Sequence, residues 1–441
     1  MTVAASSIMD AEAVKKLAPD EASLASAVKL QSARHWKSPG CYDSYLWGEC
    51  QGSALYQIKV ELEPFSYHCN CPSRKFPCKH VLGLLLLASS EPHVFIQSAP
   101  PAWMNDWLNK RKESAQRKAV RQESSEPVDV AAQEKRVEQR QTRVQDGLDR
   151  FELWLHDLIR GGLAGVEQQG QTPWVEQSRR LVDAQAPALA ARVRKLGDIP
   201  GSHPNWPTQL LQELGRIKLG LQANRQREKL PSDLVQDIRQ WLGWTVASEA
   251  VEKEGERIAD TWMVLGQWVE EDDRLTLQRT WCMGKASGQT ALLLQFAVGR
   301  AGFTVTMPVG TEQVGTMIFY PGASRLRALW KPDEGVKRAS MSAFPGSASI
   351  GHFLHGVAEK LAAFPWLDVF PCNLQQVQVH PHQDQWYVTD ITGQSLPMTS
   401  QAGWRIMALS GGNPVGLAGE WDGNQFRPLG MFHEGRYRLL P

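Results

Sequence analysis

Residues 69–80 read Cys69-Asn70-Cys71-Pro72-Ser73-Arg74-Lys75-Phe76-Pro77-Cys78-Lys79-His80. This stretch places three thiols and one imidazole within twelve residues, with the spacing C-x-C-x6-C-x-H. Cysteine and histidine side chains gathered at such short spacing are typical of a metal-ligand set. No other stretch of the 441 residues carries chemistry as specific as this one.

The spacing within the motif indicates how one ion can be reached from both ends. Cys69 and Cys71 are two residues apart, so on a strand both side chains lie on the same face. Cys78 and His80 have the same spacing, at a turn that leads into a helix. Three thiolates and one imidazole complete a tetrahedral Zn²⁺ site and leave no position for water or substrate, and sulfur ligands favour zinc over magnesium or calcium. We therefore predict one structural zinc.

The other cysteines and a nearby histidine are weaker candidates. The chain has seven cysteines, an odd number in a large protein, which argues against a disulfide framework and favours a reducing compartment. Cys41 and Cys50 have no partner at ligand spacing, so we interpret them as core thiols. His68 is a rival ligand, but on a strand it points away from Cys69. The alternative for the whole motif is a group of buried free cysteines beside a solvated histidine.

The residues around the motif resemble a known family. Gly52-Ser53-Ala54-Leu55-Tyr56-Gln57-Ile58-Lys59-Val60 precedes the C-x-C-x6-C-x-H motif, and a leucine-rich segment, 81–88, follows it. Together they resemble the SWIM zinc finger family, and more narrowly the bacterial SWIM-finger proteins in which CPSRKFPCKH is followed by a leucine-rich helix. The closing stretch SGGNPVGLAGEWDG (410–423) is similar to the same proteins.

This resemblance implies a fold, a ligand set and two kinds of partner. It implies a ββα module stabilised by zinc, with Cys69, Cys71, Cys78 and His80 as the ligands. The family is proposed to bind DNA or protein, so either role is implied for this chain. A bacterial setting further implies a MoxR-type AAA ATPase or a von Willebrand A protein as partner.

The length and patterning of the chain predict several domains. A chain of 441 residues exceeds one average domain, and 42% hydrophobic with 22% charged residues is ordinary for a globular protein. We predict an α+β multidomain protein with these parts: an N-terminal domain over 1–108 with a ββα-type zinc module at about 50–90, a basic and polar linker over 109–132, a helical bundle over 133–243, and a β-rich C-terminal domain over 244–441.

Local patterns predict the elements inside these parts. Apolar residues recur at helical spacing from Glu134 to Gly243, which predicts four or five helices, with Pro187 as a kink or break. The turns Asp422-Gly423 and Glu434-Gly435 predict hairpins in a C-terminal meander. Further predicted elements are helices at 10–33 and 350–364, strands at 41–47, 303–309 and 404–409, a turn at 38–40 and a hairpin connection at 48–52. No clear internal repeat is visible in the sequence.

Charge bears on the choice between the two implied roles. The formal net charge is +1, and residues 1–100 contain nine Lys or Arg against nine Asp or Glu. Six basic residues are candidates for nucleic-acid or partner contacts: Arg74, Lys75, Lys79, Lys110, Arg111 and Lys112. A near-neutral finger joined to a bundle and a β-rich domain favours a protein–protein adaptor. A nucleic-acid-binding protein that uses the finger and the basic tract is the alternative.

An enzyme with an unrecognised site in the β-rich domain is the third hypothesis. Its candidate residues are His380, His382 and Asp384, the pair His352 and His355, and the acidic residues Glu420 and Asp422. Surface or capping histidines and a hairpin turn explain these residues without catalysis, and no nucleophile, phosphate-loop or metalloprotease motif is present, so we expect no enzymatic activity. No apolar run can span a bilayer and the N-terminus lacks a secretory signal, so we expect a cytoplasmic protein without a membrane partner.

Overall fold

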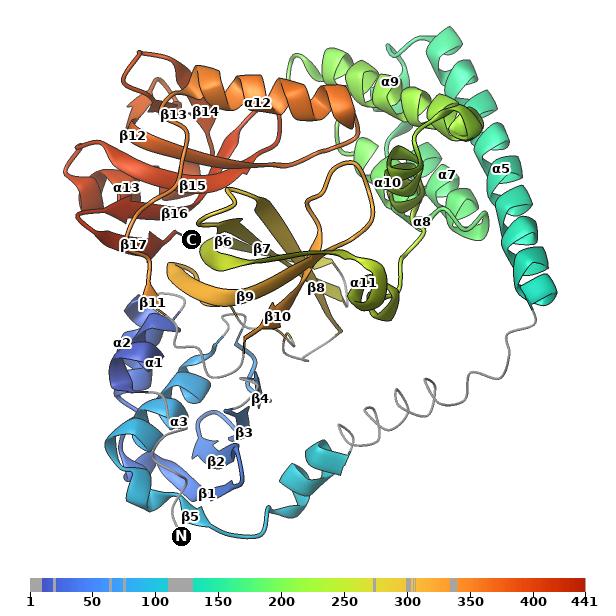
Figure 1. Ribbon diagram of the computed structural model, residues 1–441. Helices are drawn as coiled ribbons and strands as arrows, with labels where there is room; N and C mark the ends of the chain where they lie inside the picture. Colours follow the sequence, from blue (N-terminus) through green and yellow to red (C-terminus); the bar gives the residue numbers. More distant parts are fainter. Residues whose placement is uncertain are drawn as a thin grey trace.

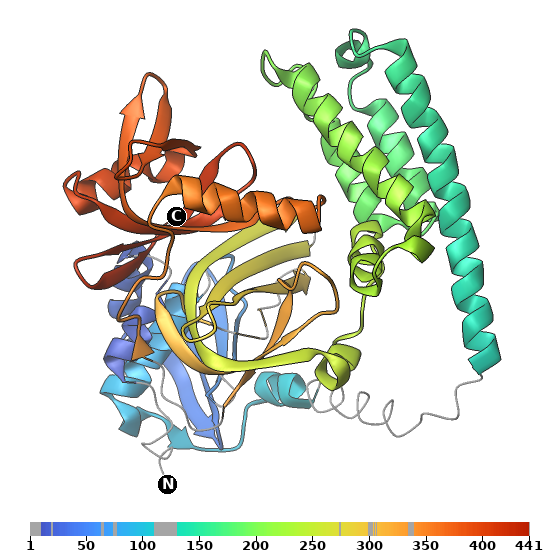
Figure 2. The ribbon, with the colours of Figure 1, turned by 45° about the horizontal axis from the view of Figure 1, so that its top comes forward.

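The computed structural model combines a small α/β module, a helical bundle and two β-sheets (Figure 1). The residues that it describes are 10–18, 21–62, 66–73, 77–109, 130–272, 275–298, 303, 305, 307–333 and 339–440. In both views of the ribbon, the N-terminal module and the bundle lie against different sides of the C-terminal sheets (Figure 2). The predicted α+β class, with an N-terminal module, a helical bundle and a β-rich C-terminal part, is confirmed.

A five-stranded sheet forms the centre of the N-terminal module. Its strands, in the order in which they pair, are β4 (Ser66–Cys69), β3 (Leu55–Glu61), β2 (Tyr45–Gln51), β1 (Trp36–Tyr42) and β5 (Ile96–Gln97). All neighbours are antiparallel except β1 and β5. Alternation in β3 buries Tyr56, Ile58 and Val60 on the face that helix α3 (Lys79–Ser90) covers.

Helix α3 is buried on nearly all sides, as its leucine-rich sequence requires. One side packs on the sheet, and α1 (Ala11–Lys16) and α2 (Glu21–Val28) pack on the other. Gly83 permits the close approach of α2, because a Cβ at this position would lie 2.8 Å from the Cβ of Leu30. A helix over 102–109 covers the opposite face of the sheet, where Trp47 packs with Met104 and Leu108.

Four predictions in this module are wrong. The predicted turn at 38–40 lies inside β1, where the strand register shifts between Lys37 and Gly40. The segment 10–33 contains two short helices rather than one long one. The predicted strand 41–47 is divided between β1 and β2 by a turn, in which Asp43 has a φ of 54°. The predicted connection at 48–52 begins inside β2, because Gly48 serves packing rather than a turn. A Cβ there would lie 2.9 Å from a methyl group of Leu84 and 3.0 Å from the ring of Trp36.

The bundle follows as a second unit. Its helices are α5 (Val130–Gly161), α6 (Val166–Gln169), α7 (Thr172–Asp183), α8 (Pro187–Leu196), α9 (Trp206–Arg225) and α10 (Ser232–Leu242). Pro187 is the first residue of α8, where its missing N–H costs no hydrogen bond, so the predicted break is confirmed. Gly243 ends α10 with a φ of 109°, a left-handed conformation that favours glycine.

The bundle core is completed by residues from the C-terminal part. Phe364 and Trp366 belong to the same buried cluster as the helices, and the indole of Trp366 donates to the Arg216 carbonyl at 2.9 Å. Beside them, both carboxylate oxygens of Asp368 accept from Arg192, at 2.7 and 2.6 Å. Arg216 donates to the same carboxylate at 3.1 Å. The segment 364–368 therefore joins the bundle to the β-rich part.

Each C-terminal sheet is preceded by a helix and contains five main strands. The first consists of α11 (Ser248–Glu254), β6 (Glu256–Asp272), β7 (Leu275–Gly284), β8 (Thr290–Val298), β9 (Thr311–Phe319) and β10 (Ala328–Pro332), with β11 (Ala339–Ser340) beside β9. The second consists of α12 (Ile350–Ala363), β12 (Phe370–His382), β13 (Gln385–Thr389), β14 (Ser395–Met398), α13 (Gly403–Ser410), β15 (Val415–Trp421) and β16 (Phe426–His433), with β17 (Arg436–Leu439) beside β16.

The two sheets have the same topology and both close into a barrel. In each, a long first strand with a bulge pairs with the fourth strand along its first half and with the second strand along its second half. A parallel contact between the third strand and the fifth then closes the ring, at Leu292 with Arg327 and at Met398 with Phe426. This five-stranded Greek-key ring is the arrangement of the OB-fold. The β-rich part is thus a structural repeat, although the sequence shows none.

Two predicted strands are wrong. Residues 404–409 belong to helix α13, which buries Ile406 and ends before Gly411 at a φ of 61°. The described residues of 303–309 are irregular. There the Val305 amide donates to the Gln295 side chain instead of to a neighbouring strand, at 2.8 Å. Met307 is 2% exposed in the core of the first barrel, which explains the apolar pattern.

A buried carboxylate joins the two barrels. Glu420 on β15 is 2% exposed. Its oxygens accept from the Arg279 guanidinium at 2.8 and 3.0 Å and from the Trp281 indole at 2.8 Å, both on β7. Arg427 on β16 also donates to it at 3.3 Å. Glu420 thus has a structural role between the two barrels.

The buried carboxylate of Asp390 predicts how the stability of the second barrel depends on pH. Its carboxylate accepts from the Ile350 amide at the start of α12 (2.7 Å), from Thr392 (2.8 and 2.7 Å) and from the Gln394 amide (3.0 Å). Burial raises the pKa of Asp390, but these hydrogen bonds outweigh burial and hold the pKa below its usual value. A depressed carboxyl pKa contributes stability above the unfolded pKa of about 3.9, and that stability is lost as the pH falls through the folded pKa.

We therefore expect Asp390→Asn to destabilise the second barrel by about 1–2 kcal/mol at pH 7. The difference from the wild type should shrink toward pH 3, because below the unfolded pKa of about 3.9 the unfolded wild-type chain takes up a proton and the stability supplied by the ionised carboxylate falls. Urea unfolding at both pH values checks this, and a difference that is the same at pH 7 and pH 3 would contradict it.

In the part of the chain that the structure describes, no helix is both long enough and apolar enough to cross a bilayer.

Candidate metal centre

The structure brings the four predicted ligands together. One ligand atom from each of Cys69, Cys71, Cys78 and His80 lies within 4.8 Å of the others. The Sγ atom of Cys69 is 3.9 Å from Nδ1 of His80, so Nδ1 is the imidazole nitrogen that faces the cluster. Cys71, Cys78 and His80 are buried, with exposed fractions of 7%, 3% and 5%. The centre is therefore enclosed by its own module.

The strand-to-loop transition places the first two sulfurs. Cys69 is the last residue of β4 and pairs with Ile58 in β3. The strand ends there, and the Asn70 side chain accepts from the Gln57 amide at 2.8 Å, which holds the next turn of chain against β3. The spacing of Cys69 and Cys71 predicted that both lie on one strand. In the structure Cys71 instead reaches the cluster from a bend that follows the strand.

The helix start places the other two ligands. Cys78 is the N-cap residue of α3, and His80 lies in the first turn of that helix. A helix N-terminus favours negative charge, which suits the thiolate of Cys78. The Tyr56 ring packs on the His80 ring at 4.8 Å between centroids, and Tyr56 in turn bonds Ser53 at 2.5 Å. These contacts fix the imidazole plane.

The grouping of the three thiols favours a bound cation. Hydrogen bonds from Cys69 and then Cys78 hold the pKa of the Cys71 thiol well below its usual range. The contact with Cys71, followed by that with Cys78 and by burial, raises the pKa of Cys69. One thiolate is thus stabilised by its neighbours, and further ionisation puts like charges in one buried site. A divalent cation removes this repulsion, and on a tetrahedral zinc with bonds of about 2.3 Å two sulfurs lie about 3.8 Å apart.

The donor set therefore fits one Zn²⁺. Three thiolates and one imidazole fill four tetrahedral positions and supply the soft ligands that zinc prefers. Such an ion stabilises a fold and supplies no open position for a substrate.

The remaining cysteines and His68 lie outside the cluster, as predicted. Cys41 is buried and its thiol donates to the Phe95 carbonyl at 3.3 Å. Burial raises the pKa of Cys50, and its neighbourhood is the module core. His68 pairs with Lys59 across the sheet, and burial, followed by the charge of Lys59, lowers its pKa. Among the described residues, no second group of histidine, cysteine or acidic side chains is close enough to hold a metal.

Comparison with protein-family models finds two matches. A SWIM zinc finger matches residues 56–89, which contain all four ligands. A SWIM-associated four-helix bundle domain matches residues 139–242, which form the bundle described above. The chain thus contains a SWIM zinc finger and a SWIM-associated helical bundle. No curated protein and no solved structure matches it. The predicted family and the predicted zinc are both confirmed.

Of the six predicted contact residues, only Lys79 lies among the residues that the structure describes. Lys79 is exposed at the first position of α3, beside the metal centre. The other five lie outside the described residues: Arg74, Lys75, Lys110, Arg111 and Lys112. Their proposed contacts stay predictions.

The histidines of the enzyme hypothesis do not gather into a site. His352 lies in the first turn of α12, and its amide donates to Ser349, the N-cap. His355 faces Glu359 at 3.5 Å on the exposed side of the same helix. The rings of His380 and His382 pack against the Tyr387 ring, with centroid-to-centroid distances of 6.2 and 6.3 Å.

Sequence reasoning missed the polar residues that join the units. Asp368 and Glu420 are single acidic residues without a motif, and their partners lie more than a hundred residues away in the chain. A sequence signal for such long-range pairs does not exist in one chain. The only hint at Glu420 was its position in an otherwise apolar strand, since a charge there needs a partner.

Proposed function

We propose that this SWIM protein is a protein–protein adaptor whose zinc has a purely structural role. The enclosed, four-ligand centre supports this role for the zinc, because it offers no open coordination position. The same consideration supports a protein without enzymatic activity at the metal. The reduced ligand thiols are consistent with the cytoplasm as its compartment.

The cleft beside the metal centre carries the proposal. A cleft of about 430 Å³ lies between α2 and the zinc-binding turn. Four serines line it: Ser23, Ser26, Ser53 and Ser73. Apart from the metal ligands, Lys79 is the one charged residue in the described lining. Phosphate backbones require several positive side chains, whereas hydroxyl groups and one aromatic ring suit a polypeptide segment. A protein is therefore the favoured partner, with a MoxR-type AAA ATPase or a von Willebrand A protein as the first candidates.

A blocked cleft tests the proposal. We expect Ser26→Arg to abolish capture of the partner from an extract of the source cells, because an arginine there fills the cleft. The wild type and the matched control Ser98→Arg, an exposed serine of the same module outside the cleft, should retain the same protein with and without nuclease. Capture that disappears with nuclease, or nanomolar and salt-sensitive binding of purified protein to DNA, would replace the adaptor with the nucleic-acid-binding alternative.

A further inference from the structure

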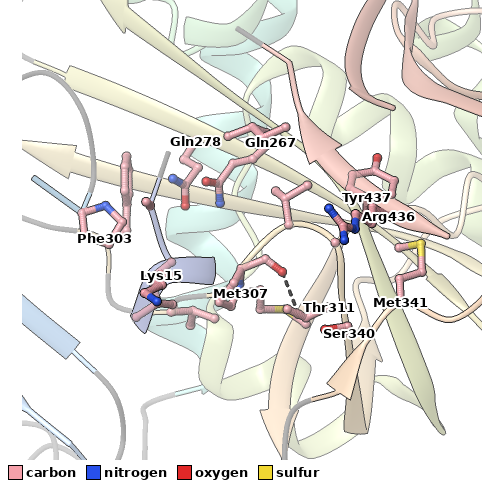
Figure 3. A pocket seen from close by; sticks show the side chains of 18 of the residues that line it. Lys15, Gln267, Gln278, Phe303, Met307, Thr311, Ser340, Met341, Arg436 and Tyr437 are labelled. Atoms are coloured by element: carbon pink, nitrogen blue, oxygen red, sulfur yellow. Dashed lines mark hydrogen bonds between the residues drawn. The ribbon is translucent and has the colours of Figure 1, made fainter. Parts of the chain in front are cut away.

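A second cavity has a lining that shares no residue with the cleft beside the zinc. Its volume is about 480 Å³, and it occupies the open end of the first barrel where the N-terminal module covers it. Figure 3 shows Gln267 and Gln278 on one side of it, with Lys15 and Arg436 at other sides. The first barrel contributes β6, β7 and the start of β9, the second barrel contributes β17, and the module contributes α1 and β4. Cavities of this volume are typical of small-molecule sites.

Hydrogen bonds determine which atoms the glutamines present to this cavity. The Gln295 side chain forms two bonds with the backbone of Val305: its Nε2 donates to the carbonyl at 2.8 Å, and its Oε1 accepts from the amide at 2.8 Å. Oxygen and nitrogen of Gln295 therefore cannot be exchanged. Its Nε2 also donates to Oε1 of Gln278 at 3.2 Å. Because Oε1 of Gln278 is the acceptor in that bond, its Nε2 remains a donor toward the cavity.

Gln267 presents the opposite group. Its Nε2 donates to the Thr280 hydroxyl at 3.0 Å, so Oε1 is left to accept. Gln278 is 5% exposed, and its Nε2 has no acceptor among the residues that the structure describes. Because Gln278 lines the cavity, this donor is open to a bound molecule, and an acceptor atom placed there gains a hydrogen bond shielded from bulk water. The two glutamines together offer one donor and one acceptor, side by side in the cavity (Figure 3).

The rest of the lining indicates the ligand class. Its described charged residues are Lys15 and Arg436, and no acidic residue is among them, which favours an anion. Tyr67, Phe303 and Tyr437 provide aromatic rings. A planar ring with adjacent donor and acceptor atoms, linked to an anionic group, satisfies all three features. The edge of β9 beside the cavity is already paired with β11, which disfavours an added peptide strand.

We propose that this cavity binds a nucleotide, with Gln267 and Gln278 at the edge of the base and Lys15 and Arg436 at the phosphate. The ligand contacts the zinc module, the first barrel and strand β17 of the second barrel, so its binding holds these parts together. This proposal is independent of the adaptor role, because the cavity and the serine-lined cleft share no residue.

Calorimetric titration of the zinc-loaded full chain tests it. The probes are AMP, CMP, GMP and UMP, with ribose 5-phosphate as the analogue without a base and the nucleosides as analogues without phosphate. We expect at least one nucleotide to bind about tenfold or more tightly than ribose 5-phosphate, since a matched pair of hydrogen bonds to a base contributes at least that factor. If none of the four exceeds ribose 5-phosphate, the proposal is wrong.

Variants separate the two parts of the site. Gln278→Leu should weaken binding of the nucleotide about tenfold and leave ribose 5-phosphate unchanged. Arg436→Ala should weaken both and leave the nucleoside unchanged. The matched control is Gln425→Leu, an exposed glutamine of the second barrel. Gln278→Glu, which keeps the acceptor for Gln295 and loses the donor, repeats the test if the leucine variant does not fold. Equal nucleotide affinity in the Gln278 variants and the control would overturn the proposal.

Discussion

Cys71→Ser or Cys78→Ser is expected to remove about one equivalent of zinc per chain and to unfold the N-terminal module. The reason is energetic, because binding of a structural zinc contributes about 10–16 kcal/mol, more than a small module gains from its other contacts. Both sulfurs are buried at 7% and 3% exposure, so a serine hydroxyl there leaves the ion with three ligands in an enclosed site. Metal analysis and limited proteolysis measure the two effects together.

Cys41→Ser is the matched control for these variants. Cys41 is buried in the same module but lies outside the cluster, and a serine hydroxyl can still donate to the Phe95 carbonyl. We expect this variant to retain its zinc and its resistance to protease. Stoichiometric zinc and an unchanged protease pattern in both Cys71→Ser and Cys78→Ser would refute the assignment of the ligands.

Glu420→Ala is expected to lower the stability of the paired barrels by about 3–5 kcal/mol. The substitution leaves the Arg279 guanidinium, whose side chain is 15% exposed, without the carboxylate that it contacts in two places. The Trp281 indole also loses its acceptor. The remaining partner of Arg279 is Glu270 at 3.3 Å, which is more exposed and therefore weaker. Urea unfolding followed by tryptophan fluorescence measures the change.

Two comparisons make the result specific to the buried pair. Glu359→Gln removes a carboxylate from an exposed pair with His355 and should change stability by less than about 0.5 kcal/mol. The double variant Glu420→Leu with Arg279→Met should regain part of the lost stability, because replacing both buried charges by apolar groups avoids the uncompensated charge. A loss in Glu420→Ala no larger than that in Glu359→Gln would show that the barrels do not depend on this carboxylate.

The metal centre could be predicted from sequence because its information is local. All four ligands lie between Cys69 and His80, and the strand and helix on either side have only to bring the ends of one loop together. The helices of the bundle could be predicted for a similar reason, because helical spacing and the start of a helix at Pro187 are local features of the sequence. A helix directly after the second pair of ligands also followed from the leucine-rich pattern.

The barrels could not be predicted because their information lies in strand pairing. The contacts that close them, Leu292 with Arg327 and Met398 with Phe426, join residues that no periodic pattern connects. Short apolar runs also fit either a strand or a helix, and residues 404–409 were assigned to the wrong one. Gly411, with its left-handed φ, was the local signal for a helix end there.

Trp366 in the core of the bundle has a consequence for synthesis on the ribosome. The helices α5–α10 leave the ribosome first, but the side chains that complete their core, Phe364 and Trp366, follow more than a hundred residues later. At about 5–20 residues per second, this interval is roughly 6 to 25 s. During it the nascent bundle exposes the apolar surface that these two rings later cover, which makes it a substrate for chaperones and proteases. A message truncated before residue 364 should therefore produce a protein that is degraded.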